Sequence, residues 1–247
     1  MESYDIFSKY YDAFTEDVDY ESKTAHICEI FKRYDRLPTL LLEVGCGSGN
    51  FSSCFYKKGI DVIGVDISEG MLSVAKEKAQ KENQNILYLN QSADELDLYG
   101  TVDGAVCLLD TVNHIVSKRQ LQQSFNKISL FLEKDRLFVF DVNTEYKQKE
   151  ILGNNTFVLQ NEEVYLVWQN WYDKTRKISD IELDFFEKQS DGYKRQTVDF
   201  CERVYEKAEL ETMLKKAGLK LIVVHCENGF SRPNKTSQRN IYVARKE

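Results

Sequence analysis

Short apolar runs alternate with amphipathic stretches through the first 150 residues of the chain. Each run is almost entirely apolar, which is typical of strands buried on both faces of a parallel sheet. The runs are Leu40–Val44, Val62–Asp66, Ile86–Leu89, Val102–Leu109 and Leu137–Phe140. Because ligands of such sheets bind beyond the carboxyl ends of the strands, we expect functional residues directly after these runs.

Between the strands, apolar residues recur with the period of helices. Asn50–Lys58 predicts a helix that ends at Gly59, since glycine readily adopts the left-handed conformation that closes helices. Ser68 and Ser117 are placed to cap two further helices, each with one apolar face. These faces consist of Met71, Ala75 and Ala79, and of Leu121, Phe125, Ile128 and Leu132. Strands that alternate with helices through right-handed crossovers predict a doubly wound α/β fold.

The hydrophobic pattern changes to period two after about residue 155. Ile181, Leu183 and Phe185 alternate with acidic residues, which predicts a strand with one buried and one solvated face. Val164–Trp168 and Thr197–Tyr205 are its expected neighbours. Three strands in a row without helices predict a small antiparallel sheet inserted into the main fold.

Helical periodicity returns over Leu210–Ala217 and ends at Gly218. Leu219–His225 and Asn240–Ala244 are the last two predicted strands, so the main sheet has seven. The predicted domains are a main domain of residues 1–153 and 204–247, which includes an N-terminal helical lid of residues 1–36, and an inserted antiparallel cap of residues 154–203.

The net charge of the chain limits the classes of molecule that we expect it to bind. The 247-residue chain has a formal net charge of −7 and a pI of about 5.2, whereas a protein that binds a phosphate backbone ordinarily carries a basic stripe. We therefore expect a small-molecule partner and no nucleic acid. No apolar run reaches the roughly 18 residues that a membrane span needs, so we expect no membrane partner.

The cysteines and the N-terminal residues bear on the compartment. The six cysteines lack the Cys-x-x-Cys spacing of zinc sites, and several lie inside apolar runs, as buried reduced thiols do. The first residues lack the basic and apolar regions of a signal peptide. These features predict a cytoplasmic protein. We expect it to be either a monomer or a homodimer.

The segment Leu42–Asn50 carries the most informative motif. It reads Leu-Glu-Val-Gly-Cys-Gly-Ser-Gly-Asn between a predicted strand and a predicted helix, the context that a cofactor-binding glycine loop needs. Glycines let the backbone turn sharply and approach a ligand closely. Asn50 occupies the third glycine position of the dinucleotide fingerprint Gly-x-Gly-x-x-Gly, which argues against an NAD-dependent oxidoreductase.

Asp66 ends the second strand, 21 residues after Gly45. A carboxylate at this place can accept hydrogen bonds from both ribose hydroxyls of an adenosine, although this alone does not distinguish NAD from S-adenosylmethionine. The alternative interpretation is an acidic residue at the start of a helix. Asp94 follows the third strand in the same way.

Glu43, the Gly-x-Gly-x-Gly loop and Asp66 resemble the first motifs of class I S-adenosylmethionine-dependent methyltransferases. Glu202–Leu219 resembles the last helix and strand of bacterial small-molecule methyltransferases, among them sugar-amine and glycine-type N-methyltransferases. The resemblance implies a Rossmann-like sheet of seven mostly parallel strands with the last strand antiparallel. It also implies S-adenosylmethionine as cofactor and a small molecule as methyl acceptor.

The resemblance also assigns cofactor contacts. Asp94 would accept the adenine amino group, with a turn aspartate as the alternative, and Met71 would pack on the adenine, with a core methionine as the alternative. The N-terminal segment is similar to an aromatic lid, in which Tyr4, Tyr10, Tyr11 and Tyr20 could face the sulfonium, and we favour Tyr11 and Tyr20. The predicted cofactor contacts are Tyr20, Glu43, Gly45, Cys46, Gly47, Gly49, Asp66, Ile67, Met71, Ala93, Asp94 and Leu109.

His114 is the candidate base. Methyl transfer from a sulfonium needs mainly an aligned acceptor, but an amine or hydroxyl acceptor must also lose a proton. His114 follows the fourth strand and resembles a histidine of some sugar-amine methyltransferases, whereas the alternative is an ordinary loop histidine. Asp110 and Asn113 beside it are candidate substrate contacts, and Tyr11 is a second catalytic candidate.

Two further questions concern metal and substrate specificity. Asp110, Asp141 and Asn143 are acidic or amide residues that could bind magnesium, but the adjacent Asp-Asn pair of catechol-type enzymes is absent, and we predict no metal.

Trp168 and Arg203 of the inserted sheet are candidate substrate contacts, the first as part of an apolar wall and the second as an anion clamp. A non-catalytic S-adenosylmethionine-binding regulatory protein remains the alternative to methyl transfer to nitrogen or oxygen.

Overall fold

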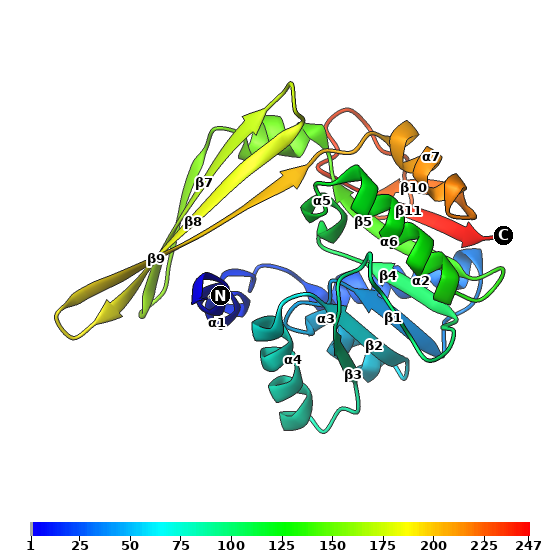
Figure 1. Ribbon diagram of the computed structural model, residues 1–247, viewed down its shortest axis with the longest axis horizontal. Coiled ribbons are helices and arrows are strands. Elements are labelled where there is room, and N and C mark those ends of the chain that lie inside the picture. The colour runs from blue at the N-terminus through cyan, green and yellow to red at the C-terminus, as the bar shows by residue number, and fades with distance from the viewer. Residues whose placement is uncertain (1) are drawn as a thin grey trace.

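The computed structural model describes residues 2–247, with side chains described from residue 6 onward. Figure 1 shows a layered α/β body and a long twisted antiparallel sheet that projects from it. Among the described residues, no helix is both long and apolar enough to cross a membrane.

Seven strands form the sheet of the body, in the order β10-β11-β5-β4-β1-β2-β3. Their bounds are β1 Leu40–Val44, β2 Asp61–Asp66, β3 Leu87–Asn90, β4 Gly104–Cys107, β5 Leu137–Asn143, β10 Leu219–Cys226 and β11 Arg239–Lys246. The first five strands pair in parallel, whereas β11 runs antiparallel to both β5 and β10. The predicted doubly wound, mostly parallel sheet with an antiparallel last strand is confirmed.

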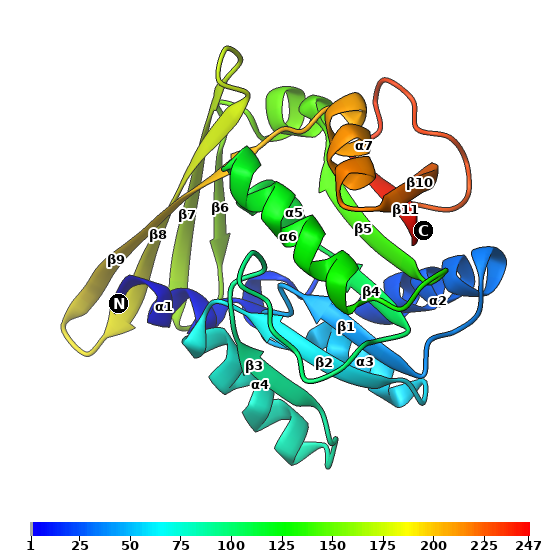
Figure 2. The same ribbon diagram turned by 45° about the vertical axis from the view of Figure 1, so that its right-hand side comes forward.

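Helices cover both faces of this sheet (Figure 2). The bounds are α2 Tyr20–Tyr34, α3 Asn50–Lys57, α4 Glu69–Lys81, α5 Thr111–His114, α6 Lys118–Phe131 and α7 Lys207–Lys216. On one face, Phe125 of α6 and Leu214 of α7 belong to one core cluster with Phe138 of β5. On the other face, Phe31 of α2 and Phe55 of α3 belong to a second core cluster.

Serine caps fix the starts of α4 and α6, as their positions in the sequence predict. The Ser68 hydroxyl accepts a hydrogen bond from the backbone N–H of Met71 at 3.2 Å, and the Ser117 hydroxyl accepts one from that of Gln120 at 3.4 Å. Each cap pairs one of the backbone N–H groups that a helix start leaves without a partner.

The fourth strand is shorter than the predicted Val102–Leu109. Val102 forms only an isolated bridge with Leu132, and the ladder of β4 ends at Cys107. Leu109 and Asp110 then adopt left-handed conformations, with φ of +49° and +57°. Because a strand requires extended backbone, these two residues begin a turn in place of continuing the sheet.

The projecting sheet has four strands, one more than predicted. Their bounds are β6 Thr156–Gln160, β7 Val164–Asp173, β8 Ile178–Gln189 and β9 Gly192–Arg203, and they pair as an antiparallel meander. The missed strand, β6, lies at the edge and exposes four of its five residues. An edge strand without a buried face shows no period-two pattern, which is why the sequence did not reveal it.

The N-terminal helices α1 (Glu2–Tyr10) and η1 (Asp12–Phe14) lie between the projecting sheet and the body (Figure 2). Ile6 and Tyr10 pack in one cluster with Phe185 of β8. On the opposite side, Asp12 forms an ion pair with Lys78 of α4. The segment therefore contacts both parts of the molecule. The side chain of Tyr4 lies outside the described residues.

Candidate active site

The three glycines of the loop after β1 adopt left-handed conformations, with φ of +72° at Gly45, +52° at Gly47 and +77° at Gly49. A Cβ atom on Gly45 would lie 2.3 Å from Cγ2 of Thr111, and one on Gly49 would lie 2.4 Å from the hydroxyl oxygen of Tyr88. A Cβ on Gly47 would face open space. Two glycines thus allow the loop to pack tightly, and the third leaves its outer surface accessible to a ligand.

Asp66 lies directly against this loop. Its carboxylate accepts hydrogen bonds of 2.8 Å from the backbone N–H groups of Gly47 and Ser68. Burial raises the pKa of Asp66, while these two hydrogen bonds act in the opposite direction. The end of β2 and the glycine loop therefore form one surface, as the predicted adenosine site requires.

A cavity of about 330 Å³ adjoins Asp66 at the end of β3. It is lined by Ile67, Asn90, Gln91, Ser92 and Glu95. The Ile67 side chain is 75% exposed, although an aliphatic side chain is ordinarily buried. An exposed apolar side chain beside a carboxylate fits a planar adenine ring that continues from a ribose.

The other predicted adenine contacts, Asp94 and Met71, are not themselves lining residues of this cavity. Asp94 accepts a hydrogen bond from the hydroxyl of Ser92, which is itself a lining residue of the cavity. Met71 is buried in the first turn of α4. Asp94 is therefore joined to the cavity through Ser92, whereas Met71 is not among the residues that line it.

Glu43 is completely enclosed beneath the glycine loop. Its carboxyl group accepts a hydrogen bond from the hydroxyl of Ser52 in α3. Burial, together with the nearby charge of Asp66, raises the pKa of Glu43 to about 8. Glu43 thus connects β1 with α3 from below the loop and is not positioned on its outer surface.

The turn after β4 is held by a buried ion pair. The backbone N–H groups of Leu109 and Asp110 donate to the carboxylate of Asp141 at 2.9 and 2.8 Å. Arg239 of β11 in turn donates to Asp141 at 2.7 Å and to Asp110 at 3.1 Å. Left-handed conformations at non-glycine residues cost of order 1–3 kcal/mol each, and such strain is frequent at functional sites.

Asp110 is kept ionised inside this network. Burial acts to raise its pKa, but the positive charges of Arg239 and Lys147 outweigh burial and hold the pKa of Asp110 at about 2. The side-chain amide of Asn143 donates to the second carboxylate oxygen of Asp110 at 2.8 Å. A negative charge therefore lies at the carboxyl end of β4.

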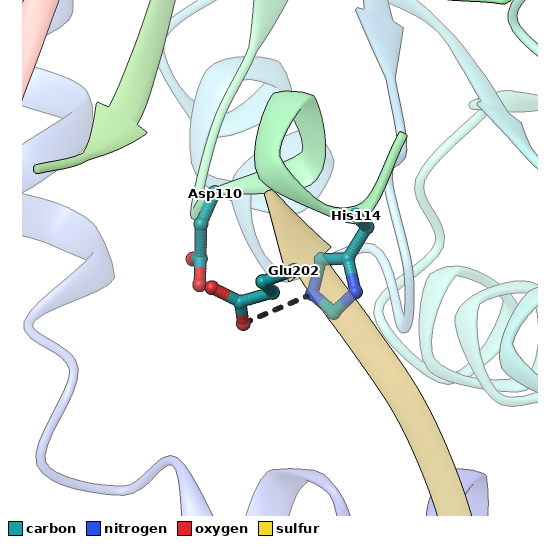
Figure 3. A group of neighbouring side chains, drawn as sticks. All are labelled: Asp110, His114 and Glu202. Carbon is teal, nitrogen blue, oxygen red and sulfur yellow. Dashed lines mark ion pairs between the residues drawn. The ribbon is translucent and has the colours of Figure 1, made fainter. Parts of the chain in front are cut away.

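Asp110, His114 and Glu202 converge at this point (Figure 3). One nitrogen of His114 and one oxygen from each acid lie within 4.8 Å of one another. The Nε2 atom of His114 is 3.8 Å from Oε1 of Glu202, and the ring of His114 lies 5.0 Å from that of Phe200. Two segments far apart in sequence contribute to this cluster: Asp110 and His114 come from the start and end of α5, and Glu202 comes from β9.

Short helix α5 places this cluster beside the glycine loop. Thr111, the first residue of α5, contacts Gly45, and His114 is the last residue of the same helix. An α-helix has about 3.6 residues per turn, so His114 lies roughly one helical turn from the residue that contacts the glycine loop. The predicted base and the predicted cofactor loop are therefore neighbours.

Comparison with known proteins agrees with this geometry. Residues 41–135 match the family model described as "Methyltransferase domain". The chain is 28% identical to the "Putative methyltransferase" of Geobacillus sp. (strain WCH70) over 99% of this chain and 100% of the relative. The crystal structure of an S-adenosylmethionine-dependent methyltransferase from Clostridium acetobutylicum ATCC 824 superposes with a TM-score of 0.87, at 27% identity and 98% coverage of each chain.

The chain is a class I S-adenosylmethionine-dependent methyltransferase. A more distant neighbour, the amino pentose methyltransferase CalS10 from Micromonospora echinaspora with bound S-adenosylmethionine, has a TM-score of 0.76 at 16% identity, with 96% of each chain covered. S-adenosylmethionine is the methyl donor. That the glycine loop, Asp66 and the cavity beside Ile67 hold its adenosine part stays a prediction.

The methyltransferase encloses Tyr11 close to the cluster around Asp110. Burial raises the pKa of the Tyr11 hydroxyl well above its usual range, and the neighbouring Tyr20 and Asp110 act in the same direction. The hydroxyl of Tyr20 donates to that of Thr15 at 3.3 Å, and its ring packs against Phe51 of α3 at 5.0 Å. Both aromatic side chains that we predicted therefore face the body of the methyltransferase.

The side chains of Asn113 and Arg203 both form hydrogen bonds with the protein backbone. The fully buried amide of Asn113 binds the backbone of Asn143 and the carbonyl oxygen of Arg203. The guanidinium of Arg203 donates to the carbonyl oxygens of Val116 at 2.7 Å and Arg176 at 3.4 Å. These contacts join β9 to the region after β4. An anion bound by Arg203 would therefore compete with backbone carbonyl oxygens for the N–H groups of the guanidinium.

Trp168 lies on the α1-facing side of the projecting sheet. Its indole N–H donates to the side-chain oxygen of Asn170 at 2.8 Å, and its ring lies 5.2 Å from that of Phe157. It belongs to the periphery of the cluster formed by Ile6, Tyr10 and Phe185. The role of Trp168 toward a substrate stays a prediction.

Sequence reasoning did not identify Lys147, Gln148 or Arg239. Lys147 begins the π-helix η2 (Lys147–Leu152), and π-helical turns occur frequently at functional sites. Its amino group donates to the side-chain oxygen of Asn143 at 3.0 Å, and burial together with Arg239 lowers the pKa of Lys147. No local motif marks these residues, because their roles depend on distant partners.

The cluster of Asp110, His114 and Glu202 has ligand types that a metal could use. However, Arg239 donates to Asp110, and the ammonium group of Lys147 is close enough to influence Asp110 and Glu202. These fixed cations offset part of the negative charge of the carboxylates, which disfavours a divalent ion. The prediction that the methyltransferase uses no metal stays a prediction.

Proposed function

We propose that this methyltransferase transfers a methyl group to nitrogen or oxygen of a small molecule, with His114 as the base that accepts the proton of the acceptor. The observation that carries this proposal is the position of His114 at the end of α5, one helical turn from the glycine loop. S-adenosylmethionine supplies an activated methyl group, so the chain needs to align the acceptor and remove its proton.

The charges around His114 favour an amine as acceptor. Asp110 is held in its ionised form, and Glu202 lies on the other side of the same small space. Carboxylates attract an ammonium group, and His114 can then take the proton that the nitrogen must lose before it attacks. The similarity in fold to an amino pentose methyltransferase supports the same preference.

We further propose that the projecting sheet of residues 154–203 and the N-terminal segment of residues 1–36 close the acceptor site as cap and lid. The packing of Ile6 and Tyr10 on Phe185 supports this role, because it attaches the lid to the cap. Closure would exclude water and place Tyr11 and Tyr20 over the reacting groups.

A panel of amino sugars, small amines and hydroxyl acceptors tests the proposal, with release of S-adenosylhomocysteine as readout. We expect turnover with at least one amine. His114→Ala should lower kcat by about 10²-fold, the lower range for general base catalysis, with unchanged S-adenosylmethionine affinity in titration calorimetry. A cofactor that binds well without turnover across the whole panel would favour a regulatory protein, and full turnover by His114→Ala would remove this residue from the reaction.

A further inference from the structure

Glu202 is a buried carboxyl group that faces the candidate base. Its side chain is 6% exposed, and Oε1 lies 3.8 Å from Nε2 of His114, whose side chain is 44% exposed. Burial and the charge of Asp110 raise the pKa of Glu202, so its ionised form is costly to keep at this place. A buried acid of this kind reduces stability unless other groups pair with it.

Glu202 is fixed from behind by two amides. Gln148 and Asn143 both donate to Oε2 of Glu202, the latter at 3.3 Å. Gln148 is itself completely buried and accepts a hydrogen bond of 2.6 Å from the hydroxyl of Ser179. These contacts fix the direction of the carboxyl group, and Oε1 points toward His114 (Figure 3).

We propose that Glu202 is the positioning residue of His114, holding the Nε2–H group of the imidazole so that Nδ1 carries the free electron pair that accepts the proton. This inference rests on the proposed function of His114 as base. A neutral imidazole has one donor and one acceptor nitrogen, and the partner of the one determines the role of the other. The separation of 3.8 Å shortens to a hydrogen bond when the acceptor binds, as is common for catalytic contacts.

The proton balance of the step is simple. An N–H bond of the ammonium acceptor breaks, its proton binds to Nδ1 of His114, and the bonding pair becomes the lone pair of the nitrogen. The electron pair of the acceptor nitrogen forms the new bond to the methyl carbon, whose former bonding pair remains on sulfur. His114 becomes an imidazolium, and the carboxylate of Glu202 stabilises it through Nε2–H.

The tautomer of His114 gives a test that needs no acceptor. The chain has three histidines, so nitrogen-15 NMR of labelled protein can assign each ring, with His26 and His225 as internal references. At a pH where the ring is neutral, we expect His114 of the native protein to be mainly the Nε2–H form. Glu202→Gln should increase the Nδ1–H form, because the glutamine can present its NH₂ group to Nε2. Glu202→Asp should retain part of the native preference.

Glu182→Gln is the matched control, since it removes a carboxylate from the same sheet at a site where the partner is Gln169. It should leave the tautomer of His114 unchanged. The inference is overturned if His114 of the native protein is mainly Nδ1–H, or if Glu202→Gln leaves the native ratio intact. Thermal unfolding checks the fold of each variant. We expect Glu202→Gln to be at least as stable as the native protein, because it removes a buried charge.

Kinetics then separate this inference from the proposed function. With an amine from the screen, Glu202→Gln should lower kcat by about 10- to 100-fold, as loss of a histidine-orienting partner does elsewhere, with little change in KM. Glu202→Asp should recover part of the rate. If no acceptor supports turnover, the proposed function fails. The NMR experiment still tests whether Glu202 determines the tautomer of His114, because it needs no acceptor. If His114→Ala abolishes turnover but Glu202→Gln does not, only the positioning role is refuted.

Discussion

Asp12 of the N-terminal segment and Lys78 of α4 form an ion pair in which Nζ lies 2.8 Å from Oδ2. The other oxygen of Asp12 accepts hydrogen bonds from the hydroxyl of Ser48 at 2.6 Å and the amide of Asn50 at 2.9 Å. A single carboxylate therefore joins the N-terminal segment to the glycine loop and to α4. Asn50, which departs from the dinucleotide fingerprint, uses its side chain for this contact.

Loss of this contact should loosen the lid and weaken cofactor binding. We expect Lys78→Ala to reduce the affinity for S-adenosylmethionine about three- to tenfold, since a half-exposed ion pair contributes at most about 1 kcal/mol and its hydrogen bonds somewhat more. Titration calorimetry measures the affinity. Lys76→Ala, on an exposed turn of the same helix, is the control and should bind normally. Equal affinities of the two variants would contradict a role of the Asp12–Lys78 ion pair in cofactor binding.

Asp66→Ala should weaken S-adenosylmethionine binding by at least tenfold. Two charge-assisted hydrogen bonds to the ribose hydroxyls are lost, and the N–H of Gly47 also loses its partner. Asp61→Ala, at the exposed opposite end of β2, tests for a general effect of removing an acid from this strand. A folded Asp66→Ala protein with native affinity would refute the ribose role.

Gly45 and Gly47 should respond differently to alanine. Gly45→Ala places a Cβ within 2.3 Å of Thr111 in addition to its left-handed strain, so we expect the free energy of unfolding to fall by about 2–4 kcal/mol. Gly47→Ala meets no neighbouring atom and should cost only about 1 kcal/mol, yet reduce cofactor affinity because its Cβ points outward from the loop. Urea unfolding and calorimetry distinguish the two effects. A stable Gly45→Ala protein would show that α5 can move away from the loop.

Because of Glu43, the free energy of unfolding should depend on pH between 4.5, the ordinary pKa of a glutamate, and about 8, its pKa in the folded protein. The folded state binds the proton more tightly than the unfolded state, so stability decreases as pH rises through this window. A pKa raised from 4.5 to about 8 corresponds to an upper limit of about 5 kcal/mol. We expect Glu43→Gln to unfold at higher urea concentration than the native protein at pH 8.5 but not at pH 5. An unchanged difference between the two pH values would show that Glu43 is ionised throughout.

The sequence predicted the parts of this protein that obey local rules. Apolar runs specified the strands of the body, serine caps specified the starts of α4 and α6, and the glycine pattern specified a loop that packs against Asp66. Each of these features depends on the backbone of a few consecutive residues or on the burial of one strand. Such requirements restrict residue types directly, so they can be recognised without knowledge of the fold.

Only the tertiary structure brought Glu202 to His114, Arg239 to Asp110 and Asp12 to the glycine loop. The residues of these pairs are separated by 88, 129 and 36–38 residues respectively, and nothing in the local sequence of either member indicates its partner. Their meeting depends on the register of β9, on the antiparallel pairing of β11 with β5, and on the packing of α1 against the projecting sheet. The sequence alone thus determined the main sheet and the glycine loop, whereas the environment of the candidate base was decided by long-range strand pairing and packing.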